Sequence, residues 1–366
     1  MSRFSKSSAV ILALTVALGA CTDGIGLNDT NDTPFDASVS AGDLQAVQGA
    51  FAATVFESLA LSSQGFGLVA DTGAVPVSLL QASLAAASSG SRWEAAAAAQ
   101  AFAAAGPAAG SLLHLDLRGR TYDRDVDGYR WNPNRTDAPV NGVRFILYEV
   151  DPVTHEPGTT EIGYVDLLDE STDLAYVARV IVVTGGVERI NYTVSAVVGA
   201  QTVAFTVSGF IGDGTTQIDV ELSMTFVHNF PVSIATVEHD FSVPSRGFEL
   251  SARVVFEFND ETLQGSIDID ATFMQGAHTV TFTGLITFSE GDLPTEGGTF
   301  EIHVDGQLFA TITVDGDTVT VQNSTGGALT AEEAQAVRSI FDGLQEMFDD
   351  RFEDFVRPVA WMCDAA

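Results

Sequence analysis

Three aspartates at alternate positions, Asp123, Asp125 and Asp127, are followed directly by Gly128 and form the pattern D-x-D-x-D-G. Carboxylate oxygens are the ligands that a hard cation such as Ca²⁺ prefers, and the glycine permits the sharp turn that brings several of them to one ion. Asp137, farther along the chain, offers a further oxygen. The spacing therefore predicts a calcium site, with a solvated acidic turn as the alternative interpretation.

The same pattern resembles the first half of the calcium-binding loop of EF-hand proteins, and this resemblance implies that the three aspartates are metal ligands. The second half departs from that family. Asn134 stands where the family has a bidentate glutamate, and Trp131 and Pro133 interrupt the loop. We expect no cofactor other than this candidate calcium ion.

Aromatic side chains surround the acidic pattern, namely Tyr122, Tyr129 and Trp131, with Arg124 and Arg130 between them. Amphipathic rings and arginines are enriched at protein interfaces. The cluster predicts a surface that binds a carbohydrate ligand or a protein partner. The alternative is that these rings pack a connecting segment onto the folded body.

The usual sequence signatures of enzymes are missing from this chain. Its six histidines include no pair at spacing i+2 or i+4, and no H-E-x-x-H motif of a zinc site occurs. The motifs G-x-S-x-G, G-x-G-x-x-G and the P-loop are also missing, and paired carboxylates carry no signal among 49 acidic residues. We therefore expect a non-enzymatic protein, with a secreted hydrolase as the less favoured alternative.

The first 20 residues have the features of an export signal. Arg3 and Lys6 give a positive start, and residues 9–18 form an apolar run that is too short to span a bilayer. The tetrapeptide L-G-A-C then ends at Cys21, and small residues before a cleavage point are typical of signal peptides. Residues 1–20 are therefore predicted to be a removable signal peptide.

The tetrapeptide resembles the lipobox of bacterial lipoproteins. That resemblance implies a diacylglyceryl group on the Cys21 thiol, cleavage before Cys21 and acylation of the new amino group, and such acyl chains hold a protein on a membrane. The alternative is an ordinary cleaved signal. In this family an aspartate directly after the cysteine marks retention in the inner membrane, but here Thr22 follows and Asp23 comes one place later. We therefore expect an outer-membrane protein that faces the periplasm or the cell surface.

The composition limits the choice of partners. The formal net charge of −33 at pH 7 disfavours nucleic acid and anionic headgroups as binding partners. Only two cysteines occur, so lipidation of Cys21 would leave Cys363 without a partner in the chain and exclude a disulfide framework. Cys363 is interpreted as a buried thiol, with an intermolecular bridge as the alternative.

The chain changes character several times behind the signal. Residues 21–42, rich in Asp, Asn, Thr and Gly, are predicted to form a lipidated flexible tether. Residues 43–110 are predicted to form an N-terminal helical region, because apolar side chains recur at helical spacing and an S-x-x-E capping box begins at Ser91. Residues 111–139 are interpreted as an acidic and aromatic connecting segment.

Residues 140–325 show the period of two that is typical of strands. Apolar and polar side chains alternate over long runs such as 218–226 and 248–258, and Asp-Gly pairs that favour tight hairpins stand at 305–306 and 315–316. Many long strands joined by short turns predict an antiparallel meander that twist curls up. The predicted fold class is α+β and mostly β: a large curved antiparallel meander sheet, half-barrel or barrel-like, with N-terminal helices and a C-terminal amphipathic helix.

That C-terminal helix is predicted over residues 330–357. Thr330 and Glu333 form a capping box, and an apolar stripe runs from Val337 to Val356 opposite an acidic face. The helix is expected to pack on the apolar face of the sheet. The alternative is a removable plug over a lipid-binding cavity.

This outline resembles the curved sheet with covering helices of periplasmic lipid- and lipoprotein-carrier proteins, although no motif is shared. The resemblance implies a membrane-anchored binding or carrier protein for an apolar ligand. A structural or protein-interaction lipoprotein with a filled core, bound to another envelope protein, is the alternative function. A cavity too small for an acyl chain would favour that alternative.

Overall fold

The computed structural model describes Leu59 and residues 111–125, 128–150, 157–199, 201–259, 261–275, 278–289, 296–316, 318–331, 333, 334, 337, 355 and 359. The chain divides into two compact units, and each is described by itself. Unit 1 comprises Met1–Gln48 and Asn229–Asp349, and unit 2 comprises Gly49–His228 and Asp350–Ala366. Within the described part of the chain, no helix is long and apolar enough to cross a bilayer.

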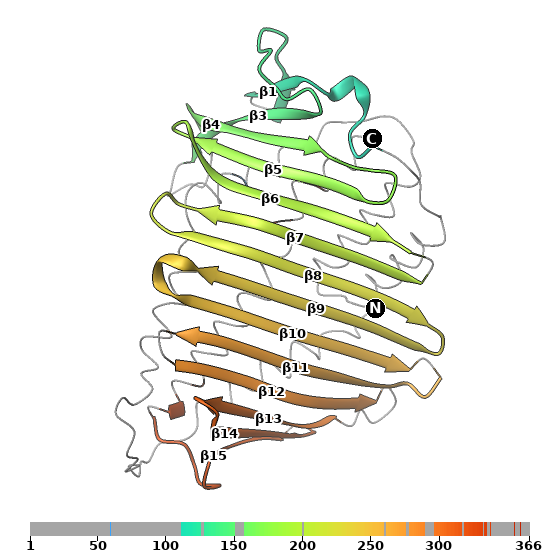
Figure 1. Ribbon diagram of the computed structural model, residues 1–366, viewed down its shortest axis with the longest axis vertical. Coiled ribbons are helices and arrows are strands. Elements are labelled where there is room, and N and C mark those ends of the chain that lie inside the picture. The colour runs from blue at the N-terminus through green and yellow to red at the C-terminus, as the bar shows by residue number, and fades with distance from the viewer. Residues whose placement is uncertain are drawn as a thin grey trace. The chain divides into compact units, whose positions relative to one another are not determined.

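Unit 2 is built on a sheet with the strand order β2-β1-β3-β4-β5-β6-β7-β8 (Figure 1). Strands β3 to β8 pair with their neighbours in the chain and run antiparallel. The hairpin of β1 and β2 joins them through a parallel pairing of β1 with β3. The bounds are η1 Leu115–Leu117, β1 Arg120–Asp125, β2 Gly128–Trp131, β3 Gly142–Val150, β4 Pro157–Asp169, β5 Tyr176–Thr184, β6 Val187–Val198, β7 Thr202–Gly212 and β8 Gln217–Asn229.

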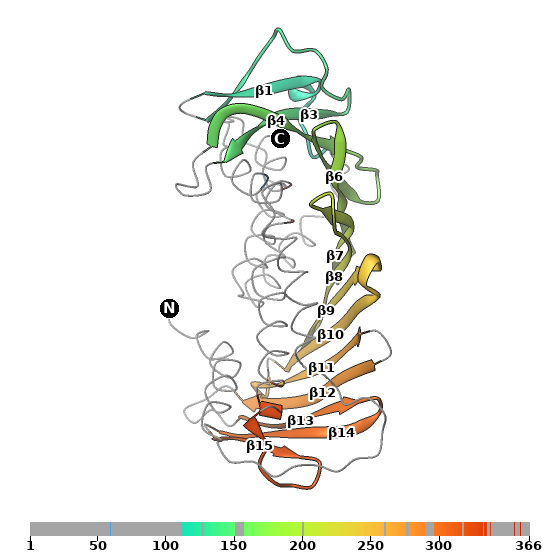
Figure 2. The ribbon, with the colours of Figure 1, turned by 90° about the vertical axis from the view of Figure 1, so that its left-hand side faces the viewer.

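Unit 1 contains an antiparallel meander in which β9 to β15 lie side by side in chain order. Seen from the side in Figure 2, its described strands form a single layer. The bounds are β9 Val232–Val243, η2 Pro244–Arg246, β10 Phe248–Asn259, β11 Gln264–Gln275, β12 His278–Ser289, β13 Glu296–Val304, β14 Gln307–Asp315 and β15 Thr318–Asn323.

Alternation along the strands places the apolar side chains on one face. In unit 2 a row of buried residues crosses four strands, with Ala178 opposite Val194, Val194 opposite Val207 and Val207 opposite Leu222. Full burial of each such valine or leucine contributes about 1.5–3 kcal/mol to folding. A slip of one residue in any strand would turn its apolar set to the other face, so these rows also fix the register.

The hairpin turns have the chemistry that their sequences predict. Gly185 and Gly186 both have positive φ values, 58° and 77°, and Asp305 and Gly306 have φ values of 53° and 78°. Two consecutive residues with positive φ match the right-handed twist of the flanking strands. The Asp-Gly prediction at 305–306 is therefore confirmed.

The mostly β, meandering character of the chain is confirmed, but two predictions need correction. Neither described sheet closes, because the first and last strands of each unit do not pair with each other, so the closed barrel-like form is not adopted. Residues 111–139 are not merely a connecting segment. They contribute β1 and β2, whose alternating residues were too few to predict strands from the sequence.

The helix predictions fall mostly on residues outside the described part. The capping box at the start of 330–357 is confirmed, because the N–H of Thr330 donates to Oε2 of Glu333 (2.6 Å) and the N–H of Glu333 donates to Oγ1 of Thr330 (3.2 Å). Beyond that box, 330–357 is described only at single positions, and 43–110 only at the buried Leu59. Cys21 and Cys363 also lie outside the described residues.

Candidate functional site

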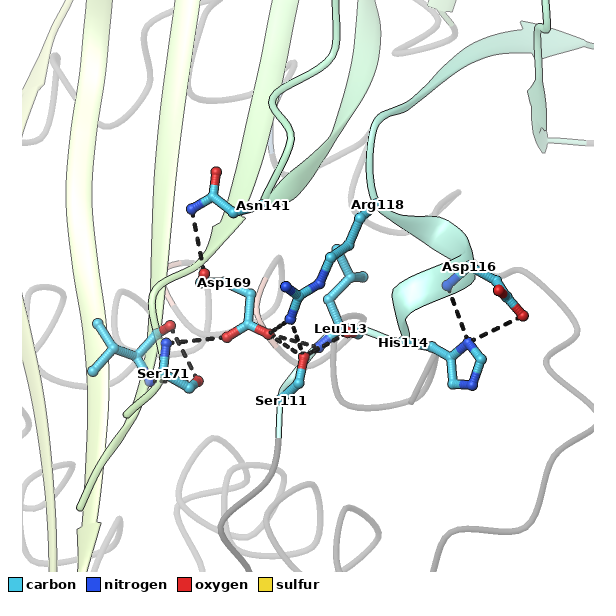
Figure 3. A network of polar contacts seen from close by, with 9 residues as sticks. Ser111, Leu113, His114, Asp116, Arg118, Asn141, Asp169 and Ser171 are labelled. Carbon is cyan, nitrogen blue, oxygen red and sulfur yellow. Dashed lines mark hydrogen bonds and ion pairs between the residues drawn. The ribbon is translucent and has the colours of Figure 1, made fainter. Parts of the chain in front are cut away.

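A buried carboxylate organises one end of unit 2. Asp169 is the last residue of β4, and its side chain is only 2% exposed. Its Oδ2 atom accepts hydrogen bonds from Nη2 of Arg118 (2.9 Å), from the N–H of Leu113 (3.2 Å) and from the hydroxyl of Ser111 (Figure 3). Its Oδ1 atom accepts from the N–H of Ser171 (3.1 Å). Four donors, one of which is the cationic Arg118, therefore compensate for the loss of hydration around this group.

The surroundings of Asp169 favour its charged form. Burial acts to raise the pKa of this carboxyl, but the hydrogen bonds from Ser111, Ser171 and the N–H of Leu113 outweigh burial and hold the pKa below its usual range. Asp169 is therefore ionised at neutral pH, and Arg118 balances its charge.

Three chain segments meet at Asp169, and we call them together the Asp169 cluster: residues 111–118, 139–142 and 169–175. The first is tied by the side-chain bonds given above. The second is tied through the backbone, because the N–H of Asp169 donates to the carbonyl of Asn141 (2.9 Å) and Nδ2 of Asn141 donates to the carbonyl of Asp169 (3.3 Å). The third follows Asp169 directly and is closed by the bond from the N–H of Glu170 to the carbonyl of Val177 (2.8 Å).

Each segment of the Asp169 cluster carries one unusually exposed aliphatic side chain. Val140 is 90% exposed, Leu174 is 85% exposed and Leu115 is 73% exposed. These are the three most exposed large apolar side chains among the described residues. The arrangement can present apolar groups to a partner.

A second ion-pair group lies in the same unit. Arg144 of β3 makes a bidentate pair with Asp166 of β4, with Nε to Oδ1 and Nη2 to Oδ2 both at 2.7 Å. Its Nη1 atom lies 2.8 Å from Oδ2 of Asp137, and its guanidinium stacks on the ring of Tyr164 at 3.6 Å. Hydrogen bonding to Asp166 raises the pKa of Arg144 despite the opposing effect of burial. This group joins the 132–141 connection to the sheet.

The predicted calcium ligands are engaged with other partners. Asp123 and Asp125 stand in β1 of a hairpin, where Oδ1 of Asp123 lies 2.9 Å from Nε of Arg135 and Oδ2 of Asp125 lies 3.3 Å from Nε of Arg130. Asp127 lies outside the described residues. Among the residues described, no group of three or more His, Cys, Asp or Glu side chains is arranged to hold a metal. The calcium site stays a prediction.

The predicted aromatic surface is divided between core and solvent. Tyr122 and Tyr129 are 1% and 6% exposed and pack on Phe145 with ring centroids 5.0 and 5.1 Å away. These two rings anchor the β1–β2 hairpin to β3, which is the packing role that the sequence analysis gave as the alternative. Trp131 is 51% exposed, and the guanidinium of Arg120 lies 4.6 Å from its ring centroid.

A small hollow lies on the apolar face of unit 2, where Val359 lies against β5, β6 and β7. This hollow has a volume of about 10 Å³, with Leu112, Val194 and Phe205 among its lining residues. Such a volume holds about one water molecule and no acyl chain. Beside it, the hydroxyl of Tyr192 donates to the carbonyl of Phe355 (2.9 Å), and the two rings meet edge to face at 5.1 Å.

Sequence reasoning did not identify the Asp169 cluster. Asp169 bonds to Ser111, Leu113 and Arg118 across 51 to 58 positions of the chain, and no local pattern reveals such pairs. One signal was available: Leu174 is a large apolar residue that directly follows the polar residues 170–173 in the connection between two strands. A large apolar residue in such a connection indicates either that its side chain packs in the core or that it is exposed for contact with a partner.

Comparisons with known proteins give this chain no relative. No protein-family model, no curated protein and no solved structure matches it. The functional argument therefore depends on the residues and their geometry alone.

Proposed function

We propose that this chain is a non-enzymatic envelope lipoprotein with a filled core, which serves as a rigid scaffold for interactions rather than as a container for an apolar ligand. The observation that carries this proposal is the hollow of about 10 Å³ beside Val359 on the apolar face of unit 2. A carrier of acyl chains needs a cavity of some hundreds of cubic ångströms.

Side-chain packing in both units supports the filled core. In unit 2 the ring of Phe355 covers Tyr192, one of the largest fully buried side chains. In unit 1 the rings of Phe282 and Phe300 stack at 5.2 Å, so these two phenylalanines pack on each other. The finer proposal, that 330–357 forms a helix on the sheet, draws support from its capping box and from the contact at Phe355.

Binding of a fluorescent fatty acid tests the filled core. The mature chain should not enhance the probe's fluorescence above the level given by an unrelated acidic protein at the same concentration. Saturable binding with one site per chain would overturn the proposal and return the carrier function to first place.

The anchor is a separate part of the proposal. We propose that Cys21 carries lipid and holds the body at the outer membrane, as residues 1–21 imply. The mass of the N-terminal peptide from detergent-extracted protein tests it: the peptide should begin at Cys21 and carry the added mass of acyl chains. The Cys21→Ser variant should lack the added mass of acyl chains, and an unmodified Cys21 in the wild type would refute the anchor.

A further inference from the structure

We propose that the Asp169 cluster is a second membrane contact, which docks on a neutral phospholipid bilayer by inserting Leu115, Val140 and Leu174. We call these three side chains the docking triad. This contact belongs to the folded body of unit 2 and acts independently of the proposed lipid on Cys21.

The distribution of exposed apolar side chains carries the proposal. Single exposed apolar residues are normal on a protein surface. Here, however, the three most exposed ones of the described residues occur on three segments that all bond to one residue, Asp169. If exposed apolar side chains were distributed at random over the surface, the three most exposed ones would not be expected to lie on segments bonded to the same residue.

Hydrogen bonds to Asp169 tie together the three segments that carry the triad. Asp169 binds the segment of Leu115 through Ser111, Leu113 and Arg118, and it binds the segment of Val140 through Asn141. Ordering of loops during binding opposes affinity, and a preformed arrangement removes much of that cost. The buried carboxylate is therefore a positioning residue for the triad.

Backbone hydrogen bonds within the three turns that carry the triad are suited to insertion among lipid chains. Hydrogen bonds close each tip: the N–H of Leu117 donates to His114 (3.0 Å), that of Gly142 to Pro139 (3.1 Å), and that of Thr172 to Ala175 (2.9 Å). Hydrocarbon offers no partners for polar backbone groups, so inserted turns must satisfy these groups themselves.

The neighbouring side chains favour a neutral bilayer as the partner. The N–H of Gly119 donates to the carbonyl of Gly142 (2.8 Å), which places the start of β1 beside the segment of Val140, and Arg120 follows with Trp131 beneath it. Tryptophan and arginine are favoured at the level of lipid headgroups. The exposed Asp116 and Asp173 repel anionic headgroups, so the membrane that fits this end is zwitterionic.

Flotation with phosphatidylcholine vesicles tests the proposal. The mature chain with Cys21→Ser, which has no lipid of its own, should float with the vesicles in a lipid-dependent manner. A triple variant with Leu115→Ser, Val140→Ser and Leu174→Ser should lose about tenfold or more in its partition coefficient, since interfacial binding scales with buried apolar area. Vesicles that also contain phosphatidylglycerol should bind the wild type less well.

A matched control removes three exposed apolar side chains elsewhere, by Val187→Ser, Val197→Ser and Leu285→Ser. This control should keep the wild-type partition coefficient, and circular dichroism should report the same fold for all chains. No vesicle binding by the wild type would overturn the proposal and leave a protein as the partner of the triad. Equal binding by both triple variants would overturn it as well, and neither outcome bears on the filled core.

Discussion

The guanidinium Nη2 of Arg118 lies 2.9 Å from Oδ2 of Asp169 and fastens the chain before β1 to the end of β4. This relationship joins two parts of unit 2 that are 51 residues apart. It depends on an ionised carboxylate that is almost wholly removed from water. Removing either partner therefore leaves the other without its counter-charge.

Replacing Asp169 tests the energetic weight of this link. Asp169→Asn keeps the shape of the side chain but removes its charge and places an amide donor opposite Arg118. We expect the free energy of unfolding to fall by about 2–4 kcal/mol, as is typical when one partner of a buried charged pair is lost. Urea denaturation measures the change. Asp173→Asn in the adjacent exposed turn is the control and should change stability by less than about 0.5 kcal/mol.

Acid should weaken the same link in the wild type. The pKa of Asp169 is lowered in the folded chain, so the folded state binds fewer protons near the usual pKa than the unfolded state does. The stabilisation is therefore present above the unfolded pKa of about 3.9 and is lost as the pH falls through the folded value. We expect the stability difference between wild type and Asp169→Asn to shrink as the pH falls from 6 to 3. A constant difference over that range would show that the charge is not what stabilises the cluster.

Close packing in unit 1 gives a test of the filled core. Gly284 of β12 lies opposite Phe300 of β13, and a Cβ atom at Gly284 would overlap the ring of Phe300. Gly284→Ala should destabilise the chain by about 1–3 kcal/mol, because the ring must leave its place. Gly297→Ala on β13 is the matched control, since its Cβ atom would come no nearer than 3.8 Å to a neighbour. Equal denaturation midpoints for the two variants would contradict this packing.

Calcium binding can be decided by thermal unfolding. A calcium ion bound as the D-x-D-x-D-G spacing predicts must displace Arg135 and Arg130 from Asp123 and Asp125, and equal melting temperatures in millimolar calcium and in chelator, within about 1 °C, would contradict that site. A higher melting temperature with calcium that disappears in Asp123→Ala would instead support the site that the D-x-D-x-D-G spacing predicts.

The features that were predictable from the sequence are local ones. Alternation identified the long strands, the Asp-Gly pair identified the turn at Gly306, and the S/T-x-x-E spacing identified the capping box at Thr330. Each depends on residues within a few positions of one another, where backbone geometry leaves few choices.

The features that escaped prediction depend on contacts across the sheet. The parallel pairing of β1 with β3 places Tyr122 and Tyr129 against Phe145. The two tyrosine rings that the sequence suggested as part of a binding surface therefore belong to the core. The burial of Asp169 likewise follows from partners far away in the chain, among them Arg118. Spacing within one segment carries no information about such partners.

Native mass spectrometry of the Cys21→Ser chain, recorded directly and again after extraction with organic solvent, tests the filled scaffold most directly. The account predicts that both masses equal that of the polypeptide alone, because the hollow beside Val359 has room for about one water molecule. An additional mass of a lipid or another apolar molecule, present once per chain and removed by the solvent, would contradict it.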